Sequence, residues 1–266
     1  MNNNWNGFAG TPPAVTFADE LGAIPFERLL ACAREATPAM VDRALARGAG
    51  ARTLEDFAAL LSPAAGERLE ELAEASHALT VARFGRTMHM YAPLYLSNEC
   101  LSSCTYCGFA RTLPIVRRTL SVAETKREAR HLTALGFRSV LLLTGEHEKE
   151  TGVEFLEQHI RALAAEVPQI SVEVQVWSEA EYRRLVAAGC EGVTIYQETY
   201  HPQTYSEIHV AGRKRRYLWR LLGPERAARA GVRRIGVGAL LGLHPEWRYD
   251  AVATAAHAAF LQRHCW

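Results

Sequence analysis

The chain has 266 residues, of which 48% are hydrophobic and 22% charged, values typical of a folded globular protein rather than a disordered one. With 30 Lys and Arg against 29 Asp and Glu, the net charge is +1, which excludes a bulk field favouring nucleic acid or an anionic membrane. No apolar run approaches the roughly 18 to 20 residues that cross a bilayer, and residues 1–10 lack the pattern of a secretory signal. We therefore expect a cytoplasmic protein without nucleic-acid or membrane partners.

The N-terminal third divides into two predicted segments. Residues 1–25 are rich in Asn, Gly and Pro without periodic apolar spacing, which predicts a flexible N-terminal segment. Residues 26–86 are rich in Ala, Leu and Glu, and Leu54, Phe57, Leu60 and Leu61 have helical spacing. We expect this second segment to be a helical N-terminal extension.

From residue 87 to residue 266, short β-rich runs alternate with amphipathic helical stretches, which predicts a parallel sheet with crossover helices. The expected strands are mostly continuous in apolar residues and cover approximately 91–96, 139–143, 170–176, 192–196 and 235–240. Ser121 and Ser178 each precede a Glu by three residues, the spacing of a helix-capping box, and Gly136 and Gly189 stand where those helices should end.

Five strands are too few to close an eight-stranded barrel. The predicted fold class is therefore α/β: a partial or truncated (β/α) barrel of the TIM type, lacking its last strands, with an N-terminal helical extension. Because an open sheet edge invites pairing, we expect either a partner at that edge or a longer protein of which the chain is a fragment.

Three of the six cysteines form a CxxxCxxC motif, at Cys100, Cys104 and Cys107, directly after the first predicted strand. The carboxyl end of such strands is where active sites are built, and thiolates suit iron–sulfur clusters, zinc or Cu(I). Three cysteines on a [4Fe-4S] cluster would leave one iron open to a ligand. Spacing alone leaves two alternatives: a chance arrangement of buried cysteines, or a zinc site completed by one further residue, such as His147, Cys190 or His201.

With Tyr106 before its third cysteine, the motif resembles the signature of the radical S-adenosylmethionine superfamily. The resemblance implies a [4Fe-4S] cluster on Cys100, Cys104 and Cys107, with S-adenosylmethionine chelating the open iron and Tyr106 contacting it through its backbone. The segment Thr144-Gly145-Glu146 resembles the motif that meets the methionyl ammonium. A glycine permits close approach of backbone to ligand, and a carboxylate suits a cation.

Two further segments, Tyr196–His201 and Ser206–Arg215, resemble the aromatic amino acid lyases of this superfamily, as does the glycine-bearing fifth strand. The resemblance implies Glu146, Gln197 and Glu198 as catalytic residues. It also implies that the cofactor is bound by Tyr106, Thr144, Gly145, Glu146, Gln175 and Glu198. In the alternative interpretation, Gln197 and Glu198 cap the next helix or pair with Lys214 or Arg215.

The implied activity is cleavage of the Cα–Cβ bond of L-tyrosine to 2-iminoacetate and p-cresol for the thiamine thiazole ring, with flavodoxin or ferredoxin as electron donor and thiazole synthase as a partner. Alternatives are a hydrogenase-maturation tyrosine lyase, a tryptophan lyase, a deazaflavin-precursor synthase, or a truncated inactive remnant that binds a metal. In the family, a strand beyond residue 266 carries an arginine-containing segment at the tyrosine carboxylate. We therefore expect these residues to cleave the cofactor but to turn over tyrosine only weakly.

Overall fold

A computed structural model describes residues 7–11 and 13–265. In this part of the chain the main sheet has five parallel strands in the order β1-β3-β4-β5-β7, so strands that follow one another along the chain also lie side by side. The strands are β1 (Ala92–Ser97), β3 (Ser139–Thr144), β4 (Gln169–Glu173), β5 (Cys190–Glu198) and β7 (Arg234–Ala239). The edge strands β1 and β7 do not pair with each other, which confirms the partial barrel.

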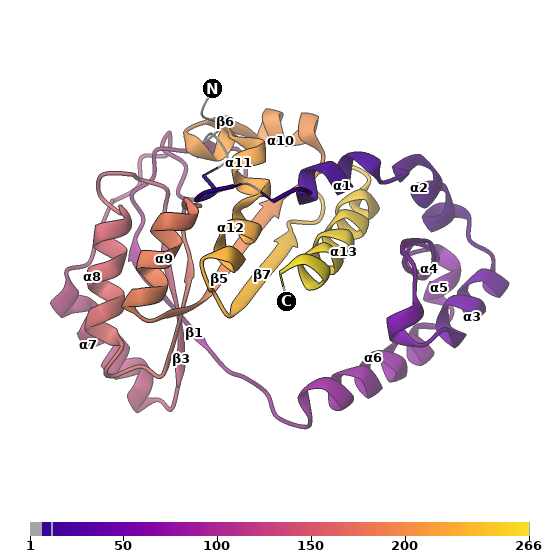
Figure 1. Cartoon of the computed structure of the whole chain (residues 1–266), viewed down its shortest axis with the longest axis horizontal. Helices are drawn as coiled ribbons and strands as arrows, with labels where there is room; N and C mark the ends of the chain where they lie inside the picture. The colour runs from indigo at the N-terminus through magenta and orange to yellow at the C-terminus, as the bar shows by residue number, and fades with distance from the viewer. Residues whose placement is uncertain (1–6, 12, 266) are drawn as a thin grey trace.

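Helices follow the strands and cover the outer face of the sheet (Figure 1). They are α7 (Val122–Ala134), α8 (Val153–Leu163), α9 (Glu179–Ala188), α11 (Tyr217–Leu221), α12 (Gly223–Arg229) and α13 (Trp247–His264). Both predicted capping boxes are present, at Ser121 and Ser178, and Gly189 ends α9 in the left-handed conformation at φ +116°. No helix of the described residues is long and apolar enough to span a membrane.

The main core lies between the sheet and these helices. Leu96, Leu142 and Val172 from the strands are fully buried against Leu156 and Ile160 of α8. The continuous apolar character of the strands therefore reflects burial on the helix-covered face, while the opposite face is free to line a site.

The helices predicted between residues 26 and 86 are present and form an arm beside the sheet (Figure 1). They are α2 (Phe26–Glu35), α3 (Pro38–Ala46), η2 (Ala49–Ala51), α4 (Leu54–Leu60), α5 (Pro63–Gly66) and α6 (Leu69–Phe84). Leu29 of α2 and Ala58 of α4 pack against Val252 of α13. This contact attaches the arm to the last helix of the sheet domain.

The structure corrects the expectation of a flexible segment over residues 1–25, of which residues 1–6 and 12 lie outside the described part. Residues 17–23 form α1 (Phe17–Ala23), which begins with a capping box between Thr16 and Asp19. Phe17 is completely buried and its ring stacks on His257 of α13, with ring centroids 4.0 Å apart. The helix is too short to show an apolar period, and its order comes from this tertiary packing.

Candidate functional site

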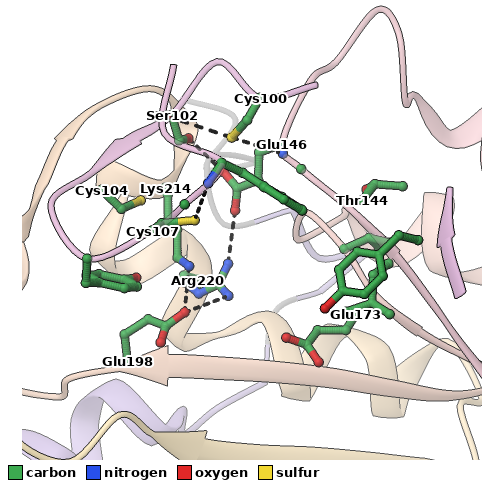
Figure 2. A pocket seen from close by; sticks show the side chains of 17 residues that line it. Cys100, Ser102, Cys104, Cys107, Thr144, Glu146, Glu173, Glu198, Lys214 and Arg220 are labelled. Carbon is green, nitrogen blue, oxygen red and sulfur yellow. Dashed lines mark hydrogen bonds and ion pairs between the residues drawn. The ribbon is translucent and has the colours of Figure 1, made fainter. Parts of the chain in front are cut away.

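The three motif cysteines lie on the loop that follows β1 and line one cavity of about 340 Å³ at the carboxyl end of the sheet (Figure 2). All three are free thiols. The Sγ of Cys100 accepts a hydrogen bond from the backbone N–H of Glu146 (3.4 Å), and that of Cys107 accepts one from Phe109 (3.4 Å). Burial raises the pKa of the Cys104 thiol to about 11, so that its deprotonation requires a compensating positive charge such as a metal.

An unexpected two-stranded antiparallel sheet, β2 (Ser103–Cys104) with β6 (His209–Ala211), holds this loop. The strand β6 follows α10 (Pro202–Ile208) and precedes η3 (Arg213–Arg215). Gly212 allows the two segments to touch, because a Cβ there would lie 2.5 Å from the Cα of Ser102. The segment that contains β6 therefore holds the cysteine loop in place at the carboxyl end of the sheet.

A buried hydrogen-bond chain reinforces this contact. His209 Nδ1 lies 2.9 Å from the carbonyl oxygen of Tyr205, which can only accept, so Nδ1 carries the proton. His209 Nε2 is then the acceptor for the Tyr106 hydroxyl, 2.9 Å away. Burial, assisted by the charge of Lys214, lowers the pKa of His209 to about 4 and keeps the ring neutral. The Tyr106 side chain thus anchors the loop, and Tyr106 also lines the cavity.

The end of β3 meets the cysteine loop directly. Gly145 donates a backbone hydrogen bond to Ser97 (3.1 Å), and Leu101 donates one to Glu146 (2.8 Å). A Cβ on Gly145 would lie 2.3 Å from the Glu99 carbonyl oxygen, a distance no side chain can adopt. Glycine is therefore required here so that the loop can pack against the strand.

A β-bulge in β5 gives Gln197 and Glu198, which the sequence analysis assigns to the same site, different surroundings. Tyr196 and Glu198 are register partners of successive residues of β7, and Gln197 is the extra residue between them. Glu198 has φ +72°, an uncommon conformation for a residue other than glycine, and its carboxylate lines the cavity. Gln197 is only 2% exposed and does not line the cavity, so its predicted place in the site is corrected.

Four charged side chains form a network on the cavity wall (Figure 2). Lys214 Nζ lies 2.6 Å from Glu198 Oε1, and Arg220 Nη2 lies 4.0 Å from the same oxygen. Arg220 Nη1 also pairs with Glu146 Oε1 at 3.1 Å, while the Ser102 hydroxyl donates to Glu146 Oε2. Burial opposes ionisation of Glu198, but Lys214 and Arg220 outweigh it and hold the pKa of this carboxyl below its ordinary value.

Gln175 is the other predicted residue that the structure places elsewhere. Strand β4 ends at Glu173, so the chain has already left the ladder at Gln175, whose amide donates to the Thr151 carbonyl (3.0 Å). Gln175 borders a separate small cavity next to Glu146 and Arg220 rather than the main one. Trp177, which also follows this strand, is buried in the core.

The structure thus gathers Cys100, Cys104, Cys107, Tyr106, Thr144, Gly145, Glu146 and Glu198 around one cavity. Their roles as ligands stay predictions. Sequence reasoning missed Glu173 and Arg220, which also line the cavity. Glu173 has an interpretable signal, since it is the charged residue at the carboxyl end of β4, whereas Arg220 lies in a short helix without a motif.

The donor set fits an iron–sulfur cluster by its chemistry. Three free thiols face one cavity, and thiolates are the ligands that such clusters prefer. Within residues 7–11 and 13–265, no three His, Cys, Asp or Glu side chains are arranged to hold a single metal ion. A cluster does not need that arrangement, because its ligands bind separate irons.

Comparison with known families identifies the class. The model of the radical S-adenosylmethionine superfamily matches residues 94–257, and the chain belongs to this superfamily. The family uses a [4Fe-4S] cluster and S-adenosylmethionine.

Among characterised relatives, the chain is similar to the 2-iminoacetate synthases. It is 43% identical over 251 residues to that of Escherichia coli (strain K12) and 40% identical over 251 residues to that of Salmonella typhimurium. Each alignment covers 94% of this chain but 66% of the relative, so the chain spans slightly less than two thirds of the length of these relatives.

Solved structures show the same architecture. The structure of HydG, a maturase of the [FeFe]-hydrogenase, superimposes with a TM-score of 0.82 at 26% identity, covering 90% of this chain and 54% of that one. Methylornithine synthase (PylB) shares the fold with a TM-score of 0.68 at 22% identity, covering 83% of this chain and 64% of that one.

Proposed function

We propose that the chain provides the cluster- and cofactor-binding part of a radical S-adenosylmethionine lyase that cleaves the Cα–Cβ bond of L-tyrosine to 2-iminoacetate and p-cresol. The observation that carries this proposal is the convergence of Cys100, Cys104 and Cys107 on one cavity beside Glu146 and Glu198. Tyrosine is proposed as the substrate because the chain is similar to 2-iminoacetate synthases over 94% of its length.

The cluster, when bound, supplies the electron that cleaves S-adenosylmethionine reductively. The three thiolates of the motif would hold it, and the β2–β6 sheet keeps their loop in place. Gly145 brings the end of β3 against that loop, so the Glu146 carboxylate would lie next to a cofactor bound there.

The network around Arg220 is suited to a zwitterionic ligand. The guanidinium is 8% exposed and bridges the carboxylates of Glu146 and Glu198. An amino-acid end group carries one ammonium and one carboxylate. Its ammonium can pair with Glu146 and its carboxylate with Arg220, so that two new ion pairs replace the one between these two side chains. Glu146 would receive the methionyl ammonium, and Arg220 would then be available to a carboxylate.

The reaction also needs a reductant, for which we propose flavodoxin or ferredoxin, and a consumer of 2-iminoacetate, for which we propose thiazole synthase. A cytoplasmic location would keep the cysteines reduced before the cluster is assembled.

The test is anaerobic reconstitution with iron and sulfide, followed by reduction in the presence of S-adenosylmethionine and L-tyrosine. We expect about four irons per chain, and mass analysis should detect 5′-deoxyadenosine, p-cresol and glyoxylate, the hydrolysis product of 2-iminoacetate. Zinc in place of iron in anaerobically purified protein would contradict the proposal.

A second candidate is another lyase of the same group, favoured by the close superposition on HydG. The same assay separates the candidates, because L-tryptophan in place of L-tyrosine, or products other than glyoxylate, would identify a different substrate or fate of the fragments.

A further inference from the structure

Glu173 lies in a row of inward-facing side chains across the first three strands of the sheet. The register pairs Tyr95 of β1 with Leu143 of β3, and Leu143 with Glu173 of β4. All three side chains line the cavity. Figure 2 shows the Glu173 carboxylate across the cavity from the three cysteines, on the side opposite Glu198.

In the described part of the chain, Glu173 is a cavity carboxylate that has no cationic partner. Lys214 pairs with Glu198, and Arg220 pairs with Glu146. Among the described residues, Glu173 has neither an ion pair nor a side-chain hydrogen bond, although it is half-buried. A carboxylate removed from water without a partner is unfavourable, so a cation bound beside it would be favoured.

Neighbouring groups show that this carboxylate is in an unusual environment. Burial, together with the charge of Glu198, raises the pKa of Glu173 above its ordinary value. Burial and the charge of Glu173 likewise raise the pKa of Tyr196, the exposed aromatic residue near the end of β5. Both shifts would be reversed by a positive charge between these residues.

We propose that Glu173 binds the ammonium group of the amino-acid substrate and so selects ligands that carry an amine. This assignment rests on the proposed function, in which the substrate is an aromatic amino acid. The substrate would lie between the cysteine side of the cavity and the row formed by Tyr95, Leu143 and Glu173, with its amino group on the carboxylate.

The chemistry favours an ammonium over the phenol of the same substrate. A phenol is a neutral donor and leaves the carboxylate charge uncompensated, whereas an ammonium supplies both a hydrogen bond and the missing charge. Lys214 and Arg220 do not supply this hydrogen bond, because neither of them forms an ion pair with Glu173. Glu173 is therefore the carboxylate of the cavity wall that remains for a substrate cation.

The test uses protein loaded with cluster and S-adenosylmethionine but without reductant, so that binding is measured without turnover. Equilibrium dialysis compares L-tyrosine with 3-(4-hydroxyphenyl)propionate, which lacks only the amino group. In the unchanged protein, we expect the analogue to bind at least about tenfold more weakly. In Glu173→Gln, tyrosine should weaken by a similar factor, and the analogue should change by less than about twofold.

Glu150→Gln is the matched control, since Glu150 is exposed and lies outside the cavity. Iron content and S-adenosylmethionine binding of Glu173→Gln should equal those of the unchanged protein, which shows that the cavity is intact. Equal affinity of the unchanged protein for tyrosine and the analogue, or equal weakening of both by Glu173→Gln, would overturn the assignment alone. Failure of every aromatic amino acid to bind the unchanged protein would overturn the proposed function together with it.

Discussion

Two buried carboxylate networks of the molecule differ in what they leave unpaired. Beneath the N-terminal segment, Glu179 is completely buried and accepts hydrogen bonds from Arg183, from Arg229 (3.1 Å) and from the backbone N–H of Ala9 (3.0 Å). At the cavity, Arg220 and Lys214 satisfy Glu146 and Glu198. Glu173, which lines the same cavity, has no such partner among the described residues.

The difference separates a structural use of charge from a functional one. The Glu179 network joins residues distant in sequence and closes on itself, so it can only hold the N-terminal segment in place. The cavity network opens onto space large enough for a ligand, and its charges can be exchanged for those of the ligand. Variants in the two regions should therefore fail in different ways.

The largest contrast is expected between two buried cysteines. Cys104→Ala removes one of the three proposed cluster ligands, and iron and sulfide content after reconstitution should fall close to zero. Cys190→Ala is the control, because Cys190 is equally buried but lies in the core, where its thiol donates to Gly192 (3.3 Å). It should retain iron and lose only about 1 kcal/mol of unfolding free energy. Full iron content in Cys104→Ala would contradict the assignment of this ligand.

Gly145→Ala should separate loop placement from ligand identity. The new Cβ would displace the backbone of Glu99, next to Cys100, at a cost of about 1–3 kcal/mol. We expect faster loss of iron to a chelator, with all three cysteines still present. Gly66→Ala, outside the cavity and with open space around it, should release iron at the unchanged rate. Equal rates for both variants would show that the contact does not hold the loop.

Glu179→Gln and Glu198→Gln compare the two networks directly. Removing the charge of Glu179 breaks its ion pairs with Arg183 and Arg229. Because these two arginines are partly exposed and can be hydrated, chemical denaturation should show a loss of only about 1–2 kcal/mol. Binding of S-adenosylmethionine should be unaffected. Glu198→Gln should do the reverse, weakening cofactor binding with a smaller loss of stability. If the two variants exchanged these outcomes, the distinction drawn between the networks would be wrong.

The sequence predicted the parts of the molecule whose determinants are local. Strand periodicity, the capping boxes at Ser121 and Ser178 and the cysteine spacing all act within a few residues, and the structure contains the corresponding elements. The resemblance to a family then indicated which strand ends carry the site.

The rest depends on contacts between distant segments. The bulge that turns Glu198 toward the cavity and Gln197 away from it arises from pairing with β7. The β2–β6 sheet joins residues about a hundred positions apart, and the charge on Glu173 becomes informative only once Lys214 and Arg220 are known to be paired elsewhere. None of these relations leaves a local pattern.

The smallest effect at neutral pH is expected at His257, where α1 packs on α13. Its Nδ1 lies 2.9 Å from the Tyr200 hydroxyl, its ring stacks on Phe17, and burial lowers its pKa to about 3. In the unfolded chain the imidazole has its ordinary pKa of about 6.5, so below that pH the unfolded state takes up a proton that the folded state refuses.

The contribution of His257 to the free energy of unfolding is therefore complete above about pH 6.5 and is lost as the pH falls toward 3. The loss has reached about 2 kcal/mol at pH 5. His257→Gln should flatten the dependence of unfolding free energy on pH in this window. His209 at the cavity shifts in the same direction, to about 4, so His209→Gln should flatten it separately. Only the second variant should also accelerate iron loss, because only His209 contacts the cysteine loop through Tyr106.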